Sequence, residues 1–166
     1  VGKDIELDVE RIKAVYSAVE DRALTRVDAN QAWTAKQAVF AIQTLENAGV
    51  RMDLVEQPVK AQDLEGMKYV TERVHTPIMA DESVFGPTEV IDLIRMRAAD
   101  IINIKLMKTG GISNALHIAD IAAMSAPAEK TRSPAVRRST TRGGSRTGST
   151  TWTPGWRGGG ARGRLN

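Results

Sequence analysis

Four short, largely apolar segments recur along the chain, and each of them ends in a charged residue. Their length and their branched side chains are typical of buried strands in a parallel sheet. The segments are Leu24–Asp28, Asp53–Glu56, Pro77–Asp81 and Ile101–Lys105. Their charged ends are 28, 25 and 24 residues apart, close to the roughly 30 residues of a strand–helix–strand unit. The pattern therefore predicts four parallel strands with their carboxyl ends at one edge.

Between these segments, apolar residues recur at steps of three and four, which predicts helices. We expect helices over residues 4–20, about 63–74 and about 112–124, and two more that begin near Thr34 and Pro87. Thr34 and Gln37 fit a capping box, and Gly49 supplies a stop for that helix. One helix followed by four strand–helix units places the chain in the α/β class, with parallel strands and the helices outside.

The periodic pattern stops after Met124. Residues 125–166 contain eight glycines, nine basic residues and one acidic residue, whereas residues 1–124 contain 14 basic and 19 acidic residues. A segment with so few aliphatic side chains cannot offset the entropy that ordering costs, so we expect a disordered tail. We interpret the abrupt change as a frame error or an artificial end, which would make the tail spurious. The predicted organisation is a catalytic domain over 1–124 and a tail over 125–166.

Composition narrows the cellular setting and the available chemistry. The chain has no cysteine, which excludes disulfides and thiolate metal ligands. No stretch reaches 18 uncharged apolar residues, and the first residues, VGKD, lack the apolar core of a signal peptide. We therefore expect a cytoplasmic protein without a membrane partner.

The charged residues at the predicted strand ends suggest a specific chemistry. Asp28, Glu56 and Asp81 would repel one another at a shared edge unless a cation lay among them. Mg²⁺ suits oxygen ligands and can stabilise the charge that develops when a proton leaves the carbon next to a carboxylate. Lys105 would be the base, because cationic neighbours lower the pKa of a lysine.

Four motifs carry a resemblance to a known family. They are VDANQ at 27–31, VEQP at 55–58, MADES at 79–83 and INIKLMKTGG at 102–111. Together they resemble the barrel of the enolase superfamily, in its muconate-lactonizing subgroup. The residues around Asp81 and Lys105 are most similar to dipeptide epimerases of the L-Ala-D/L-Glu epimerase type.

The resemblance implies a partial TIM-type (β/α) barrel, with Mg²⁺ bound by Asp28, Glu56 and Asp81 and with Lys105 in acid/base catalysis. It implies a small-molecule substrate, a dipeptide or related carboxylate, and a homo-oligomer for the complete protein. Other activities of the subgroup stay open as alternatives: cycloisomerase, o-succinylbenzoate synthase and N-acylamino acid racemase.

The chain also departs from the family pattern. A Lys-x-Lys pair would directly precede Val1, and the capping domain, two early strands and a late Asp-x-Asp element are not found in this sequence. Inversion at a carbon needs a base on each face. We therefore expect a fragment of the barrel domain that is inactive as an epimerase by itself.

Several further residues could either take part in the site or have an ordinary structural role. Asn30 is expected to be a hydrogen-bonding neighbour of the site rather than a ligand. Lys108 would bind a substrate carboxylate or be solvated, and Glu82 and Ser83 would contact substrate or only cap a turn.

A function of another class, non-enzymatic RNA binding, would use arginines and tryptophans of the tail. The residues concerned are Arg132, Arg137, Arg138, Arg142, Arg146, Trp152 and Trp156. We favour the disordered or spurious tail over this reading and do not expect a nucleic-acid partner.

Overall fold

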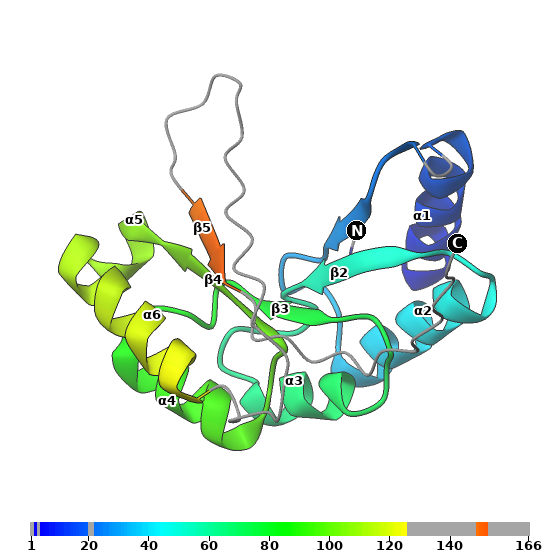
Figure 1. The fold of residues 1–166 in the computed structure, drawn as a ribbon. Coiled ribbons are helices and arrows are strands. Elements are labelled where there is room, and N and C mark those ends of the chain that lie inside the picture. Colours follow the sequence, from blue (N-terminus) through cyan, green and yellow to red (C-terminus); the bar gives the residue numbers. More distant parts are fainter. Residues whose placement is uncertain (1, 3, 20–21, 126–148, 153–166) are drawn as a thin grey trace, which may run out of the picture.

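The computed structural model describes residues 2, 4–19, 22–125 and 149–152. After a first helix, strands and helices alternate along the described part of the chain as far as residue 105, and two helices follow (Figure 1). The elements are α1 (Ile5–Val19), β1 (Thr25–Asp28), α2 (Ala35–Asn47), β2 (Met52–Glu56), α3 (Leu64–Thr71), β3 (Ile78–Ala80), α4 (Pro87–Met96), β4 (Ile101–Lys105), α5 (Leu106–Thr109), α6 (Ile112–Ser125) and β5 (Ser149–Trp152).

The strands form one sheet in the order β1-β2-β3-β4-β5. The first four strands pair in parallel with their sequence neighbours, which confirms the predicted α/β arrangement. The register aligns Asp28 with Glu56, so the ends of β1 and β2 are level. Figure 1 shows α2, α3, α4 and α6 following one side of the curved sheet.

Local sequence signals account for where the helices begin. The capping box is present: Thr34 donates its backbone N–H to Gln37 Oε1 at 2.9 Å, and Gln37 donates its own to Thr34 Oγ1 at 3.4 Å. Asp63 caps α3 by accepting from the Gly66 N–H at 2.8 Å. Helix α3 ends at Thr71, three residues before the end that the apolar stripe predicted.

The core lies between the sheet and these helices. Helices α2, α3, α4 and α6 contribute some of its largest fully buried side chains, which include Ile42, Leu45, Met67, Leu93 and Ile118. All residues of β3, and the first four of β4, are buried. Burying each large aliphatic side chain contributes about 1.5–3 kcal/mol, so the packed helices hold the strand ends in place.

Two elements differ from the sequence-based expectation. A short helix, α5, follows Lys105 directly and ends at Thr109, and the next residue, Gly110, caps it with a left-handed φ of 74°. In the tail, where we expected no regular structure, β5 pairs antiparallel with β4 from Ile102↔Trp152 to Lys105↔Ser149. Residues 126–148 and 153–166, including the arginines considered for RNA binding, lie outside the described residues.

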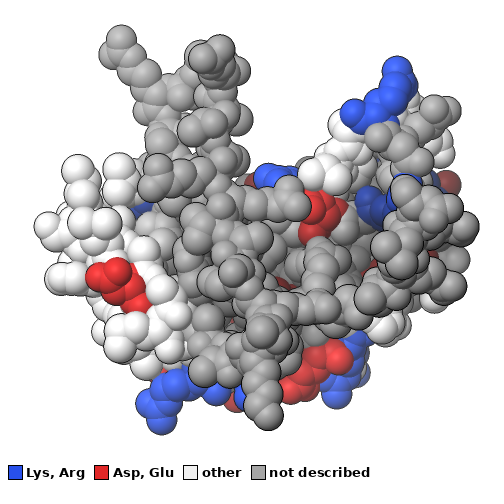
Figure 2. Space-filling view, viewed as in Figure 1, with Lys and Arg blue, Asp and Glu red and all other residues white. Residues whose placement is uncertain are grey.

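The helix lengths and the surface charges bear on two other interpretations, a membrane span and RNA binding. Among the described helices, none is long and apolar enough to cross a membrane. Figure 2 shows acidic and basic side chains next to one another along the lower margin, where Figure 1 places α3 and α4. Charges of mixed sign do not favour a polyanion such as RNA at this margin.

Candidate active site

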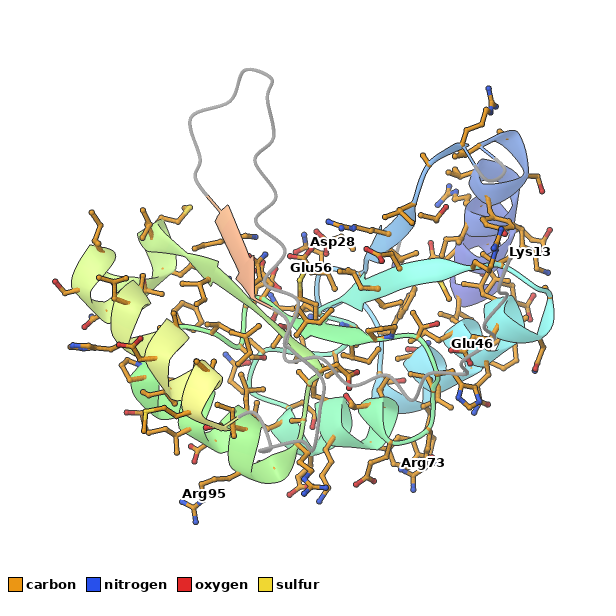
Figure 3. The ribbon with its side chains drawn as sticks, in the orientation of Figure 1. Lys13, Asp28, Glu46, Glu56, Arg73 and Arg95 are labelled. Atoms are coloured by element: carbon orange, nitrogen blue, oxygen red, sulfur yellow. The ribbon has the colours of Figure 1, made fainter. Side chains whose placement is uncertain are left out.

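The charged ends of the four parallel strands lie at one edge of the sheet. Asp28, Glu56 and Lys105 are the last residues of β1, β2 and β4, and Asp81 directly follows β3. Figure 3 shows Asp28 and Glu56 near each other at this edge. The structure thus brings the predicted ligands and the predicted base to one site, because strand ends in a parallel sheet point the same way.

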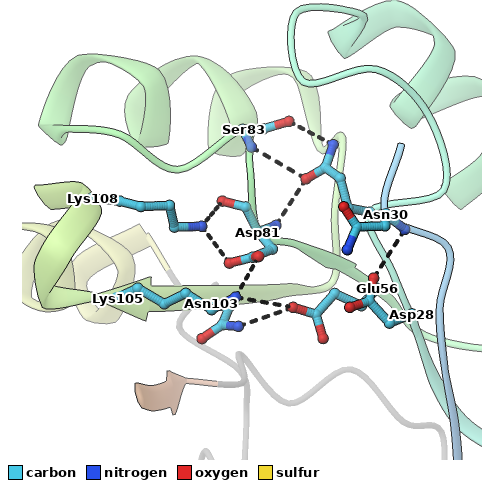
Figure 4. Close-up of polar contacts among 9 residues, drawn as sticks. Asp28, Asn30, Glu56, Asp81, Ser83, Asn103, Lys105 and Lys108 are labelled. Carbon is cyan, nitrogen blue, oxygen red and sulfur yellow. Dashed lines mark hydrogen bonds and ion pairs between the residues drawn. The ribbon is translucent and has the colours of Figure 1, made fainter. Parts of the chain in front are cut away.

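Two lysines converge on Asp81 (Figure 4). Lys105 Nζ lies 2.6 Å from Asp81 Oδ2 and 3.8 Å from Glu56 Oε1. Lys108 Nζ contacts Asp81 Oδ1 and donates to the Asp81 backbone oxygen at 2.5 Å. The side chain of Lys108 is only 14% exposed, so it belongs to the site rather than to the solvent.

Lys105 lies among carboxylates, and these affect its pKa. Burial lowers its pKa, but the hydrogen bond to Asp81 and the charges of Asp81, Glu56 and Glu82 act in the opposite direction. The lower pKa that we predicted depends on a bound dication and stays a prediction, whereas the protein groups alone raise the pKa of Lys105 above its ordinary value. The reason is that the described neighbours of the ammonium group are carboxylates, and these stabilise the charged form.

Glu56 has a raised pKa. Burial is the largest cause, and the charges of Asp28 and Asp81 add to it. A hydrogen bond from Asn103 Nδ2 to Glu56 Oε1, 3.1 Å long, and the charge of Lys105 act against this shift. Asn103 was not singled out from the sequence, although its place two residues before Lys105 puts both side chains on one face of β4.

The other candidates lie around these charged groups in different ways. Asn30 donates its backbone N–H to Asp28 Oδ1 at 2.9 Å, so the contact comes from its main chain. Ser83 donates its hydroxyl to the Ala61 carbonyl at 2.8 Å, and this bond links the loop after β3 to the loop after β2. Glu82 Oε2 is buried and has no hydrogen-bond partner among the described residues.

Gln57 was also missed by the sequence reasoning. Its side chain is fully buried beside the site and accepts a hydrogen bond from the backbone N–H of Asp81 at 2.8 Å. The available signal was its position directly after Glu56, at a predicted strand end.

The donor chemistry of the site fits Mg²⁺. Three carboxylates at adjacent strand ends are hard oxygen donors. Burial is the main cause of the raised pKa of Glu56, and the charges of Asp28 and Asp81 add to it. Among the described residues, however, no three acidic or histidine side chains are grouped as metal ligands. Both carboxylate oxygens of Asp81 face lysines. A cation bound by Asp81 would therefore compete with these lysines for its oxygens.

The chain matches the family model described as "Enolase C-terminal domain-like" over residues 1–126. It is 52% identical to the L-Ala-D/L-Glu epimerase of Clostridium acetobutylicum over 122 residues, which is 74% of this chain and 34% of that protein. It is 40% identical to muconate cycloisomerase 1-2 of Acinetobacter lwoffii over 115 residues, which is 69% of this chain and 29% of that protein.

A solved structure is similar over the same region. The dipeptide epimerase of Enterococcus faecalis V583, complexed with Mg and the dipeptide L-Leu-L-Tyr, superposes with a TM-score of 0.72 at 52% identity. The match covers 75% of this chain and 35% of that one. The chain therefore spans about a third of the length of these relatives.

Proposed function

Because the chain belongs to the enolase C-terminal domain-like family, we propose that it forms part of the active site of a dipeptide epimerase. The observation that carries this proposal is the contact of Lys105 with Asp81 and Glu56 at the shared strand edge. That edge occurs in a chain 52% identical to an L-Ala-D/L-Glu epimerase. The substrate would be a dipeptide, and the reaction would invert the carbon next to its carboxylate.

Asp28, Glu56 and Asp81 would hold Mg²⁺ in this proposal. Support comes from their oxygen-donor chemistry and from the relative of known structure that is complexed with Mg and a dipeptide. When bound, the ion would stabilise negative charge on the substrate carboxylate. Asn103 would help to orient Glu56, because its amide donates to one Glu56 oxygen and leaves the other oxygen available.

Lys105 would move the proton on one face of the substrate. In the present arrangement its raised pKa keeps it as an ammonium ion, which can give a proton but cannot accept one. Accepting a proton requires Lys105 to lose its 2.6 Å contact with Asp81. A ligand that draws Asp81 away would therefore also activate the lysine.

Inversion needs a second proton-transfer group on the opposite face. Lys105 serves one face, and we propose that the other group comes from the two thirds of the relatives that this chain does not span. By itself, this part of the enzyme is then expected to bind the substrate, or to exchange its proton on one face, without inverting the carbon.

Other reactions of the subgroup are less well supported. The chain is 52% identical to the Clostridium epimerase and 40% identical to the Acinetobacter cycloisomerase, over regions of similar length. The higher identity favours the epimerase. Cycloisomerase, o-succinylbenzoate synthase and N-acylamino acid racemase activities remain the alternatives to compare in the same assay.

The test is a chimera in which residues 1–125 replace the matching segment of the Enterococcus faecalis epimerase. NMR would follow deuterium incorporation from D₂O into L-Leu-L-Tyr and into its epimer. We expect Lys105→Ala to reduce exchange from one face about 100-fold or more, the scale of general-base catalysis. Lys13→Ala is the matched control, because Lys13 lies on α1, pairs with Glu10 and is 35% exposed. Undiminished exchange from both faces in the Lys105→Ala chimera would overturn the proposal.

A further inference from the structure

Gln57 occupies a strained position next to the site. It follows Glu56, its φ of 38° is left-handed, and its exposed fraction is 0%. A non-glycine residue rarely adopts this backbone conformation, which costs about 1–3 kcal/mol. Polar side chains such as glutamine are mostly exposed in proteins. Both features require compensating contacts.

The side-chain amide of Gln57 uses its whole hydrogen-bonding capacity. Oε1 accepts from the backbone N–H groups of Asp81 at 2.8 Å and Ser83 at 3.2 Å. Nε2 donates to Ser83 Oγ at 2.9 Å and to the Val59 carbonyl at 3.1 Å. An amide has two donor hydrogens and two acceptor lone pairs, so none is left over. In Figure 4, dashed lines mark hydrogen bonds at the labelled Asp81 and Ser83.

The backbone of Gln57 also contacts the segment that follows β1. Its N–H donates to the Met79 carbonyl at 2.8 Å, and its carbonyl accepts from the Gln31 N–H, also at 2.8 Å. Gln31 lies three residues after Asp28. One residue therefore contacts the segments that carry Asp28, Glu56 and Asp81.

We infer that Gln57 is a positioning residue, which fixes Asp81 relative to Glu56 by holding the backbone after β3. The partner that distinguishes this role from ordinary core packing is Asp81 itself. A hydrogen bond to the Asp81 N–H determines where its Cα, and so its carboxylate, can lie. The part of the inference that concerns metal affinity rests on the proposed function.

The test compares Gln57→Met with the unaltered chain of 166 residues. Methionine keeps an unbranched side chain of similar size but cannot make the four hydrogen bonds. Hydrogen exchange of the Asp81 and Ser83 amides, followed by NMR, should become about tenfold faster or more. Mg²⁺ affinity, measured by calorimetry on the folded protein, should fall about 10-fold.

Gln31→Met is the matched control. The Gln31 side chain accepts from the Ala61 N–H at 3.0 Å, so this variant loses a bond to the same loop without touching Asp81. We expect the Asp81 exchange rate and the Mg²⁺ affinity of this control to stay unchanged. Ser83→Ala provides a second probe if Gln57→Met does not fold, and it should speed Asp81 exchange several-fold.

The outcomes separate the two proposals. The inference is overturned if Gln57→Met, or Ser83→Ala in its place, lowers global stability while Asp81 exchange and Mg²⁺ affinity stay at their unaltered values. If the unaltered chain bound no Mg²⁺, the metal site of the proposed function would fail. The exchange rates would still decide the role of Gln57.

Discussion

At the scale of single residues, Asp81 is the group on which the site depends. Its side chain is 6% exposed, and its two oxygens face Lys105 and Lys108. A buried carboxylate needs such partners because desolvation otherwise makes its charge costly. The same oxygens are the ones that a metal would need, so the lysines and a cation compete for them.

Replacing Asp81 tests this competition. Asp81→Asn should weaken Mg²⁺ binding about tenfold or more, because it removes the charge of a proposed ligand. Calorimetry on the folded protein gives the affinity. Asp53→Asn is the control, since Asp53 lies at the other end of β2 and pairs with Arg26 at 2.9 Å. Equal affinities for the two variants would contradict the role of Asp81.

At the scale of elements, the helices hold the strand ends through their buried faces. Leu93 on α4 is 1% exposed, whereas Leu116 on α6 is 59% exposed. Only the first of these side chains fills space between a helix and the sheet. The contribution of each helix should therefore come from a few buried residues.

Leu93→Ala should lower the free energy of unfolding by about 2–5 kcal/mol, because it removes buried methyl groups and leaves a cavity. Leu116→Ala makes the same chemical change on an exposed face and should alter it by about 0.5 kcal/mol or less. Urea denaturation followed by circular dichroism measures both values. Similar losses in the two variants would show that α6 is covered in solution.

At the scale of the whole molecule, the outer strands of the described sheet are β1 and β5. Among the described residues, β1 pairs only with β2, and β5 lies along the outer side of β4. Unpaired strand edges invite pairing with another chain. The two helices that follow β4 also carry exposed apolar side chains. Met107 on α5, and Ile112 and Met124 on α6, are more than two-thirds exposed.

Removing β5 should therefore promote self-association. A chain ending at Ser125 would leave the outer edge of β4 without the partner that the structure gives it. Sedimentation velocity over a range of concentrations should show more dimer or larger species for this chain than for the full 166 residues. Identical sedimentation would indicate that β5 does not protect the edge in solution.

The sequence by itself determined the periodic part of this protein. Alternation of apolar strands and amphipathic helices fixed the α/β class, the parallel order and the approximate bounds of the elements. It also placed Asp28, Glu56, Asp81 and Lys105 at one edge, because the carboxyl ends of parallel strands share it. These features follow from spacing along the chain, which the sequence records directly.

Only the tertiary structure decided which groups meet at that edge. It paired Lys108 with Asp81, placed Asn103 on Glu56, and buried Gln57 against Asp81 and Ser83. It also placed Lys105 beside carboxylates that raise its pKa. Each of these depends on distances between residues more than 20 positions apart. Burial and the charge of such neighbours set a pKa, and no local pattern along the chain contains either.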